Sequence, residues 1–573
     1  MKVSLPWLKE LTDYSLSTDD LANELSLNSI GVKQQTEDYL ELDLTYNRGD
    51  LLSMRGVAYE VAAITDTPLR FLAQTPEDFV WVGQNLPKTP IEISESELSK
   101  VQCVARIENL KVGESPKEVV HKLQACGMRS VDNITDVTNL IMLEFGQPLH
   151  SFDASTVKEE TIIVRSAKKG EEITTLDNKS RKLTSEDIVL ADTQKPLDVA
   201  GVMGGKDTEI KPSTSTILVS ASMFDPIMVR KTSKRLGLYS EASKRFQHGL
   251  STLRLLQALD AAIKMYQGLG GKLTAINLVG NFNQLKKSIN LSIKKVNDLL
   301  GLKLDEETIT SCLKKLSFVV KKLDEDTLEV IPPYFRLDIN IEEDLVEEVA
   351  RMYGYEKIEG IKLAEEKIPK LDQTLPNFIY ELKSKLKELG LTEVNTYSFY
   401  STAVLEALGF DTDNRKLLIK IANPISSETE YLRMDLWPNL LEVVAKNIKQ
   451  GFKDIAVFEI GKTYSKTTKG EPTENYRLSI VLMNNTDNPL EELYQITQKW
   501  NGNFKLSPAL PPKVVENLFH PKRFVNIERN GKPFDKAQGR QIAGMAEVHL
   551  KLLNKLGIEK RVAVLEINID DLL

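Results

Sequence analysis

The chain has 573 residues, of which 41% are hydrophobic and 27% are charged, and its formal net charge at pH 7 is −8. This length predicts three to five domains, and because no run of about 18 apolar residues occurs, we expect no transmembrane helix. The negative balance excludes nucleic-acid binding driven by bulk charge, so any RNA contact needs local basic patches or a partner.

The first predicted domain covers residues 1–82. Its N-terminus, MKVSLPWLKELTDYS, lacks the apolar core of a signal peptide, so we expect a cytoplasmic protein. Ser17 and Asp20 form a predicted capping box, and alternation over residues 40–44 predicts a strand. Asp50 is the predicted cap of the next helix, which carries apolar residues from Leu51 to Ile64.

The second predicted domain covers residues 95–283 and alternates strands with helices. One helix is predicted from Pro116 to Cys126, with Ser115 as its cap. Residues 137–143 are mostly apolar and predict another helix, which Gly146 ends. The segment GVMGGK, residues 201–206, fails the spacing of a phosphate loop, so we expect a tight turn that lines a pocket.

Two features of this domain each have two interpretations from the sequence. His150 follows the Gly-Gln-Pro stop, and a lone histidine is more often structural than catalytic. Six basic residues, which either contact phosphates or form a solvated helix face, lie in the segment RKTSKRLGLYSEASKRFQHG; they are Arg230, Lys231, Lys234, Arg235, Lys244 and Arg245.

The third predicted domain covers residues 288–360. Two short helices, the second capped by Asp305, a hairpin and a final helix are typical of a winged-helix-like module. Alternation over residues 334–341 predicts a half-buried strand. Asp344 is the predicted cap of the final helix, whose apolar stripe runs from Leu345 to Met352 and which Gly354 ends.

Four carboxylates gather in this stretch, at Asp338, Asp344, Glu347 and Glu348. Carboxylate oxygens are the ligands that Mg²⁺ prefers. However, acidic residues in a first helical turn are also favoured by the helix dipole, and Arg336 and Arg351 offer counter-ions. Spacing alone favours this second interpretation over a metal site.

The fourth predicted domain covers residues 370–573. A helix is predicted over 375–389 and strands over 394–399 and 455–460, so helices packed on an antiparallel sheet are expected. The three cysteines occupy apolar patterns, which predict core positions rather than a disulfide or zinc site; they are Cys103, Cys126 and Cys312.

Five blocks occur in order: YNRGDLLSMRGVAYEVA, DVTNLIMLEFGQPLHSFD, RLGLYSEASKRFQHG, PPYFRLDINIEEDLVEEVARMYGYEKI, and YLRMDLWPNLLEVVAKN with VFEIGKTY. With these blocks the chain resembles, over nearly its whole length, the beta subunit of bacterial phenylalanyl-tRNA synthetase. The resemblance implies an α+β multidomain fold: a mixed α/β editing domain, a winged-helix-like module, and an antiparallel class II synthetase-like core without catalytic power.

The resemblance also implies a heterotetramer of two alpha and two beta chains that charges tRNA(Phe). The alpha subunit would use ATP to activate phenylalanine. Arg433 lies in a motif-2-like segment of this chain, but no glycine-rich motif with an ATP-binding arginine follows it. In the family, the positions of Asp338, Asp344, Glu347 and Glu348 bind Mg²⁺ at the boundary with alpha, and the resemblance favours that role here.

The second predicted domain resembles the family's editing domain, which hydrolyses mischarged Tyr-tRNA. The matching pocket positions are Thr138, Asn139, His150, Gly204, Ser240 and Ala242. Ser220 occupies the position where relatives often have a glutamate that binds the tyrosine hydroxyl. Because serine is shorter and uncharged, we expect weakened or lost editing.

The chain departs from longer relatives in two further places. Val32 is followed within a few residues by Leu40, where relatives insert an OB-fold tRNA-binding domain. The sequence ends at VLEINIDDLL, where relatives continue into a ferredoxin-like anticodon-binding domain. Two alternatives to an editing subunit remain, a scaffold without editing and a free-standing deacylase of mischarged tRNA; the class II-like fourth domain argues against the deacylase.

Overall fold

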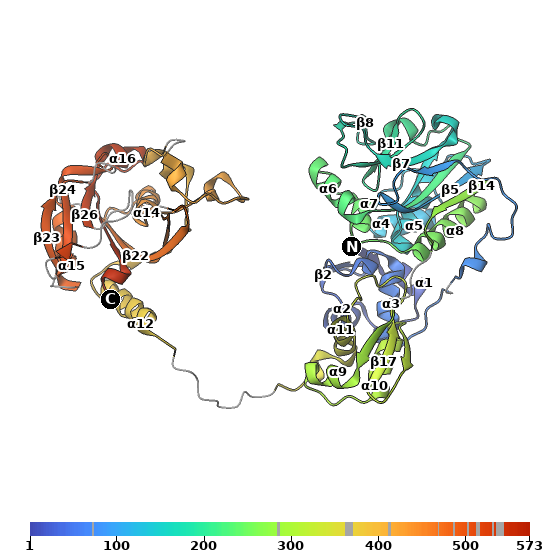
Figure 1. Ribbon diagram of the computed structural model, residues 1–573, viewed down its shortest axis with the longest axis horizontal. Coiled ribbons are helices and arrows are strands. Elements are labelled where there is room, and N and C mark those ends of the chain that lie inside the picture. The colour runs from blue at the N-terminus through green and yellow to red at the C-terminus, as the bar shows by residue number, and fades with distance from the viewer. Residues whose placement is uncertain are drawn as a thin grey trace. The chain divides into compact units, whose positions relative to one another are not determined.

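The structure is a computed structural model of the chain, and it describes residues 1–71, 74–282, 287–360, 371–410, 414–467, 469–484, 488–500, 504–511, 516–529, 532–533 and 544–573. Contacts divide the chain into two compact units, Met1–Lys362 and Leu363–Leu573 (Figure 1).

The first unit begins with helices packed beside a small antiparallel sheet of strand order β1-β3-β2. Ser17 caps α2 as predicted, but Asp50 does not cap α3, because Ser53 accepts the capping N–H and Asp50 lies in a preceding 3₁₀ turn. Residues 36–38 join β2 to β3 directly, so no domain lies between them in this chain. The elements are β1 Lys2–Ser4, α1 Leu5–Leu11, α2 Thr18–Asn28, β2 Val32–Gln35, β3 Tyr39–Leu42, η1 Gly49–Leu52, α3 Met54–Thr65 and η2 Pro76–Asp78.

The middle of this unit holds two larger sheets, of strand orders β14-β5-β13-β6 and β12-β11-β10-β7-β4, and a β8-β9 hairpin. Helices α5 and α8 cover one face of the first sheet (Figure 1). The elements are β4 Ile91–Ile93, β5 Ser99–Glu108, α4 Lys117–Ala125, α5 Asn133–Phe145, β6 Leu149–Asp153, η3 Ala154–Thr156, η4 Lys158–Glu160, β7 Ile162–Ser166, β8 Glu172–Thr174, β9 Ser180–Lys182, β10 Ile188–Ala191, β11 Pro196–Val199, β12 Met203–Gly204, η5 Lys206–Thr208, β13 Ile217–Phe224, α6 Pro226–Leu236, α7 Glu241–Gln247, α8 Thr252–Gly268 and β14 Lys272–Gly280.

Side-chain alternation on β13 determines what lies between these two sheets. Ile217, Val219 and Ala221 point toward α5 and α8, and they belong to one core. Leu218 belongs to a second core, shared with the five-stranded sheet. Because successive side chains of a strand point to opposite faces, Ser220 and Ser222 also face the five-stranded sheet.

The helix predictions in this region hold with one correction. The predicted helix end at Gly146 is confirmed, since that residue adopts a left-handed conformation after α5. Ser115 does not cap α4: Pro116 occupies the capping position, and the Ser115 hydroxyl instead donates to Asp136 at 2.6 Å.

The first unit ends with a three-stranded sheet of order β15-β17-β16 and three helices. Asp305 caps α10 as predicted, and Gly354 ends α11. The elements are β15 Ile289–Ser292, α9 Ile293–Leu300, α10 Glu306–Lys315, β16 Val319–Lys322, β17 Thr327–Ile331, α11 Glu342–Tyr353 and η6 Tyr355–Lys357.

The predicted strand over residues 334–341 is wrong. The segment is a turn and loop, in which the Arg336 N–H donates to the Pro333 carbonyl. Arg336 is buried and Leu337 is exposed, the reverse of the predicted pattern. Asp344 is not the cap of α11 either, because it is the third helical residue, and its carboxylate accepts the N–H groups of Asn340 and Ile341.

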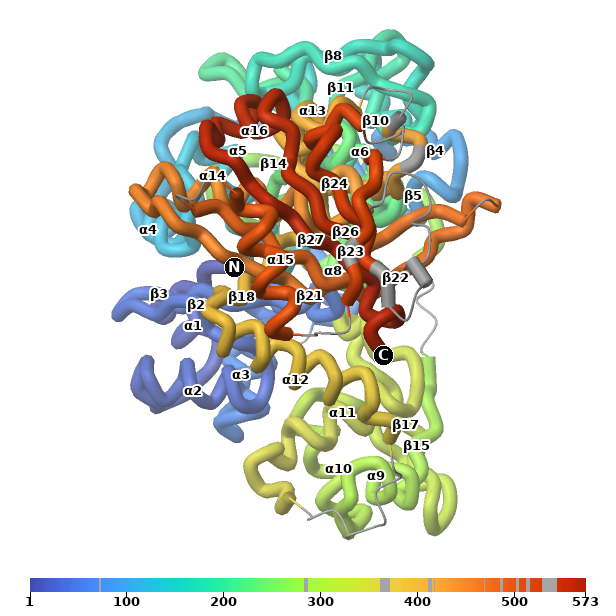
Figure 2. Tube along the Cα trace, turned by 90° about the vertical axis from the view of Figure 1, so that its left-hand side faces the viewer, coloured from blue at the N-terminus to red at the C-terminus, as the bar shows by residue number. Residues whose placement is uncertain are grey.

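The second unit is a sheet between helices, as predicted, and it is antiparallel except that β18 runs parallel to β21 (Figures 1 and 2). Helix α14 packs on one face, and α12 and α15 pack on the other. Among its described residues the strand order is β18-β21-β22-β27-β26-β24-β23, with β25 beside β24.

The elements of the second unit are α12 Thr374–Glu388, β18 Thr392–Glu393, β19 Phe399–Tyr400, α13 Thr402–Ala407, η7 Asn414–Leu417, η8 Ser427–Thr429, β20 Tyr431–Leu432, α14 Trp437–Lys449, β21 Ile455–Lys466, β22 Pro472–Met483, α15 Pro489–Trp500, β23 Phe504–Ala509, β24 Phe519–Arg529, β25 Lys532–Pro533, β26 Gly544–Val548, α16 Leu550–Lys555, β27 Ala563–Asn568 and η9 Ile569–Asp571. The predicted strand over 394–399 is wrong, since β18 ends at Glu393 and only Phe399 of the predicted range lies in a strand, β19.

Two expectations from composition hold in the described part of the chain. The side chains of all three cysteines are unpaired and buried, as predicted. None of the described helices combines the length and the apolar character needed to cross a membrane.

Candidate functional site

A small cavity of about 80 Å³ lies between the two large sheets of the first unit. The β6 and β13 strands of one sheet and the β10, β11 and β12 strands of the other contribute to its walls, and α7 contributes two more residues. The lining residues are Pro148, Leu149, His150, Leu190, Asp198, Gly201, Val202, Met203, Gly204, Ser220, Ser222, Phe224, Ala242 and Phe246. Most of them are apolar, with a few polar groups, as in many ligand sites.

His150 lies on β6, directly opposite Ser220 of β13. Its ring packs edge-on against Phe152, with 4.6 Å between ring centroids. A Cβ atom on Gly204 would lie 2.7 Å from Cε1 of this ring, so the close approach requires glycine at that position. Burial lowers the pKa of His150 to about 4, so the imidazole is neutral at pH 7 and offers one donor and one acceptor nitrogen.

Asp198 is the second titratable side chain among the described residues that line the cavity. It lies on β11, is 7% exposed, and its Oδ1 atom has no hydrogen-bond partner among the described residues. Burial raises the pKa of Asp198 to about 7. Sequence reasoning missed this residue, although an aspartate inside the apolar run PLDVAGV is a signal that could have pointed to it.

The structure brings together four of the seven residues predicted for the editing pocket: His150, Gly204, Ser220 and Ala242 line the cavity. Ser240 lies beside it, capping α7 and donating to the carbonyl of the lining residue Val202 at 2.7 Å. The remaining two, Thr138 and Asn139, lie on α5 and do not line this cavity; the Thr138 hydroxyl donates to the Thr135 carbonyl. The expected turn at Gly201 and Gly204 does line a pocket.

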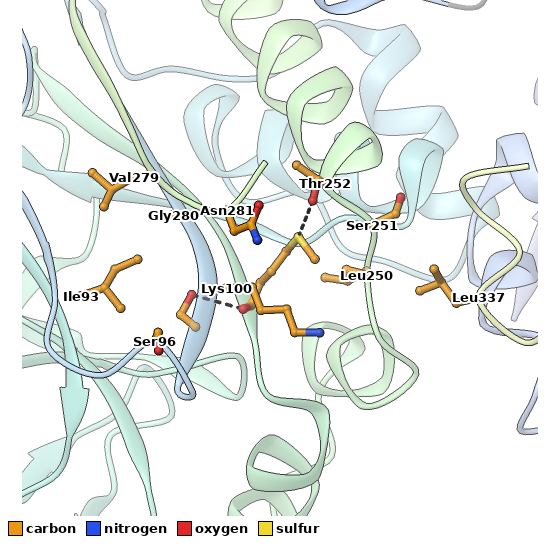
Figure 3. A pocket seen from close by; sticks show the side chains of 12 residues that line it. Ile93, Ser96, Lys100, Leu250, Ser251, Thr252, Val279, Gly280, Asn281 and Leu337 are labelled. Atoms are coloured by element: carbon orange, nitrogen blue, oxygen red, sulfur yellow. Dashed lines mark hydrogen bonds between the residues drawn. The ribbon is translucent and has the colours of Figure 1, made fainter. Parts of the chain in front are cut away.

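A larger cavity of about 690 Å³ lies near the N-terminus of α8 (Figure 3). Two of its polar side chains bind Met223: Ser99 donates to the Met223 carbonyl and Thr252 to the Met223 sulfur. Lys100, the titratable residue in its described lining, is exposed. The small cavity, with a neutral imidazole and a buried carboxyl group, is therefore the better candidate for chemistry.

The four predicted magnesium ligands lie around the start of α11. Both oxygens of Asp338 accept from Arg336, and Glu348 accepts from Arg336 and Arg351. Glu347 is exposed and has no hydrogen bond or ion pair with the described residues. Among the described residues, no group of three or more His, Cys, Asp or Glu side chains is placed to hold a metal ion, so this geometry does not by itself form the predicted site.

These arginines belong to a buried network that joins the N-terminal helices to α11. Arg48 donates to Asp50 and Glu60, Arg351 donates to Glu60 and Glu348, and Arg336 donates to Glu348 and Asp338, with N–O distances between 2.5 and 2.8 Å. Burial alone would raise the pKa of Glu348, but Arg351 and Arg336 hold it at about 2. The network therefore stays ionised at neutral pH.

In the second unit, Arg433 is also buried and paired. It donates to Glu459 at 2.8 Å and to the Lys462 carbonyl at 3.0 Å. A Cβ atom on Gly461 would lie 2.6 Å from this guanidinium group. Arg433 is thus bound inside the unit and is 3% exposed.

Comparison with known proteins identifies the modules to which these sites belong. Residues 100–271 match the B3/4 domain, residues 289–355 match the tRNA synthetase B5 domain, and residues 369–569 match the phenylalanyl tRNA synthetase beta chain CLM domain. The cavity lies within the first of these ranges. The modules define a tRNA synthetase component built from several domains.

Curated relatives identify the family within that class. The chain is 38% identical over 459 residues to the phenylalanine--tRNA ligase beta subunit of Carboxydothermus hydrogenoformans, covering 77% of this chain and 55% of that protein. It is 32% identical over 588 residues to the same subunit of Syntrophus aciditrophicus, and the match covers 96% of this chain and 69% of that protein. It is 33% identical to the same subunit of Moorella thermoacetica, and that match covers 92% of this chain and 66% of that protein. The chain belongs to the phenylalanine--tRNA ligase beta subunit family, and it matches little more than half to about two thirds of these relatives' own length.

Proposed function

We propose that this chain supports the charging of tRNA(Phe) as the partner of an alpha subunit, and that the cavity between its two sheets hydrolyses mischarged aminoacyl-tRNA. The observation that carries the proposal is the neutral His150 imidazole held against Gly204 in a pocket of the B3/4 domain. The alpha subunit would use ATP and carry the aminoacylation site, which agrees with Arg433 being paired inside this chain. Two alpha and two beta chains in the cytoplasm are the proposed assembly.

The proposed hydrolysis needs a water molecule and a group that takes its proton. Water adds to the ester carbonyl carbon, the bond to the ribose oxygen breaks, and that oxygen receives the proton. The acceptor nitrogen of His150 can take the proton from water and return it, because the imidazole is neutral at pH 7. The apolar walls limit the entry of further water.

Deacylation of Tyr-tRNA(Phe) by the assembled enzyme tests the editing proposal. We expect the wild-type complex to hydrolyse this ester and His150→Ala to lower the rate by about 10²-fold or more, the usual contribution of a positioned acid or base. His121→Ala is a matched control, since His121 is exposed and lies outside the cavity. Equal rates for wild type and His150→Ala would favour the alternative, a scaffold without editing.

The predicted Mg²⁺ site stays a proposal that depends on the family resemblance. Its carboxylate donors suit the ion, but Asp338 and Glu348 are already paired with arginines, so ligands from outside the described residues would have to complete it. Glu347→Gln changes the predicted ligand that is exposed and unpaired, and we expect it to reduce the magnesium dependence of assembly with alpha. Sedimentation with and without a chelator measures this, and an unchanged dependence would argue against the site.

A further inference from the structure

The small cavity holds a carboxyl group that the proposed hydrolysis does not use. Asp198 is 7% exposed, and its Oδ1 atom has no hydrogen-bond partner among the described residues. A buried polar atom without a partner destabilises the folded protein relative to a paired one. Such a group is retained at a cost to the free protein, which is typical of a site that binds a ligand donor.

The strand register places Asp198 on the same side of the sheet as the imidazole. Asp198 pairs directly with Gly204 of the neighbouring strand, and direct cross-strand partners have Cβ atoms about 4.5–5.5 Å apart on one face. On that face, the position of the missing Gly204 Cβ lies 2.7 Å from the His150 ring. The carboxyl group and the imidazole therefore border the same small space.

The two serine side chains of this wall already have protein partners. Gln102 donates to the Ser220 hydroxyl at 2.8 Å, and the Ser222 hydroxyl donates to the other end of Gln102 at 2.5 Å. Around them the lining is apolar, with Leu190 and Phe224 among its members. A ligand hydroxyl that enters this space can donate to the Oδ1 atom of Asp198, which has no hydrogen-bond partner among the described residues.

We propose that Asp198 determines the specificity of this cavity by accepting a hydrogen bond from a hydroxyl group on the aminoacyl side chain of the substrate. This inference depends on the proposed hydrolysis. A substrate with the hydroxyl satisfies the buried carboxyl group, whereas one without it leaves the group unpaired and is rejected. The cavity volume of about 80 Å³ suits the hydroxyl-bearing end of a side chain, and tyrosine against phenylalanine is the pair that differs only in this group.

The test compares hydrolysis of Tyr-tRNA(Phe) and Phe-tRNA(Phe) by the assembled enzyme. We expect Asp198→Ala to lower the Tyr rate about tenfold or more and not to lower the Phe rate, so that the ratio of the Tyr rate to the Phe rate falls. Asp198→Val also removes the polar group but stays closer to the original volume in a strand, and it gives the same comparison if the alanine variant does not fold. Asp207→Ala, an exposed carboxylate of the same segment, is the control and should keep the wild-type ratio.

The outcomes separate this inference from the proposed function. A wild-type ratio in a folded Asp198 variant, with hydrolysis still dependent on His150, would overturn the specificity role and leave the editing function standing. If the wild-type enzyme and His150→Ala are equally inactive, the editing function fails and the inference fails with it. If the ratio of the Tyr rate to the Phe rate falls in the Asp198 variants but not in Asp207→Ala, the result supports both the specificity role of Asp198 and the editing function.

Discussion

At the scale of single residues, burial shifts the pKa values of His150 and Asp198 in opposite directions, and each shift favours the neutral form of the side chain. The low pKa keeps the imidazole neutral, and the raised pKa keeps a large fraction of the Asp198 carboxyl groups protonated near pH 7. Neither state could be predicted from the sequence, because both depend on strands that meet only in the folded domain. His150 and Gly204 could be predicted from the sequence, because each lies in a short motif that resembles the family's editing domain.

Asp198 leads to a prediction about stability and pH. Its folded-state pKa of about 7 lies above the ordinary value of 3.8, so the folded state prefers the protonated form, and the contribution of this group to stability declines as pH rises from about 4 to 7. The decline is about 4 kcal/mol at most, since one pKa unit corresponds to about 1.4 kcal/mol. Asp198→Asn lacks this ionisation.

Thermal unfolding of wild type and Asp198→Asn at pH 5 and pH 8 measures the effect. We expect the first unfolding transition of wild type to fall relative to that of Asp198→Asn on going to pH 8. The same pH dependence in both proteins would show that the carboxyl group is not buried as described.

At the scale of elements, local signals identified most helices but not every cap, and they failed for the segment 334–341, where distant residues decide the structure. Caps such as Ser17 and Asp305 lie next to the turns that they stabilise, so a short window contains the whole cause. The segment 334–341 was misassigned because alternation assumes that charged side chains face water. Arg336 is buried instead, with partners that include Glu348 twelve residues later.

The ion-pair network gives a second prediction, for Glu348→Gln. Removing this charge leaves Arg336 and Arg351 without a shared partner in a buried setting, which costs roughly 3–5 kcal/mol. The pKa of Glu348 is held at about 2, so its contribution is present above the unfolded value of about 4.5 and is lost as pH falls through about 2. We expect a lower first thermal transition at pH 7.

The neighbouring carboxylate supplies a matched control for that variant. Glu347 is on the same helix, but it is exposed and unpaired among the described residues, so Glu347→Gln should leave the transition within the small range typical of surface changes. Equal effects of the two variants would contradict the network as a source of stability. The comparison also separates stability from the proposed magnesium site, which would involve both residues.

At the scale of the whole molecule, three matched modules lie along one chain, and the contacts gather them into two units. The B3/4 and B5 ranges lie within the first unit, where buried ion pairs link the N-terminal helices to α11. The order of motifs predicted this family from the sequence. The network could not be predicted, since Glu60 and Arg351 are separated by 291 positions.

The central claim is that this chain is the supporting subunit of a two-chain charging enzyme. The most direct measurement is the rate of phenylalanine transfer to tRNA(Phe) by the cognate alpha chain, alone and with this chain added. The account predicts little transfer by alpha alone and substantial transfer by the mixture. Equal rates with and without this chain would contradict it.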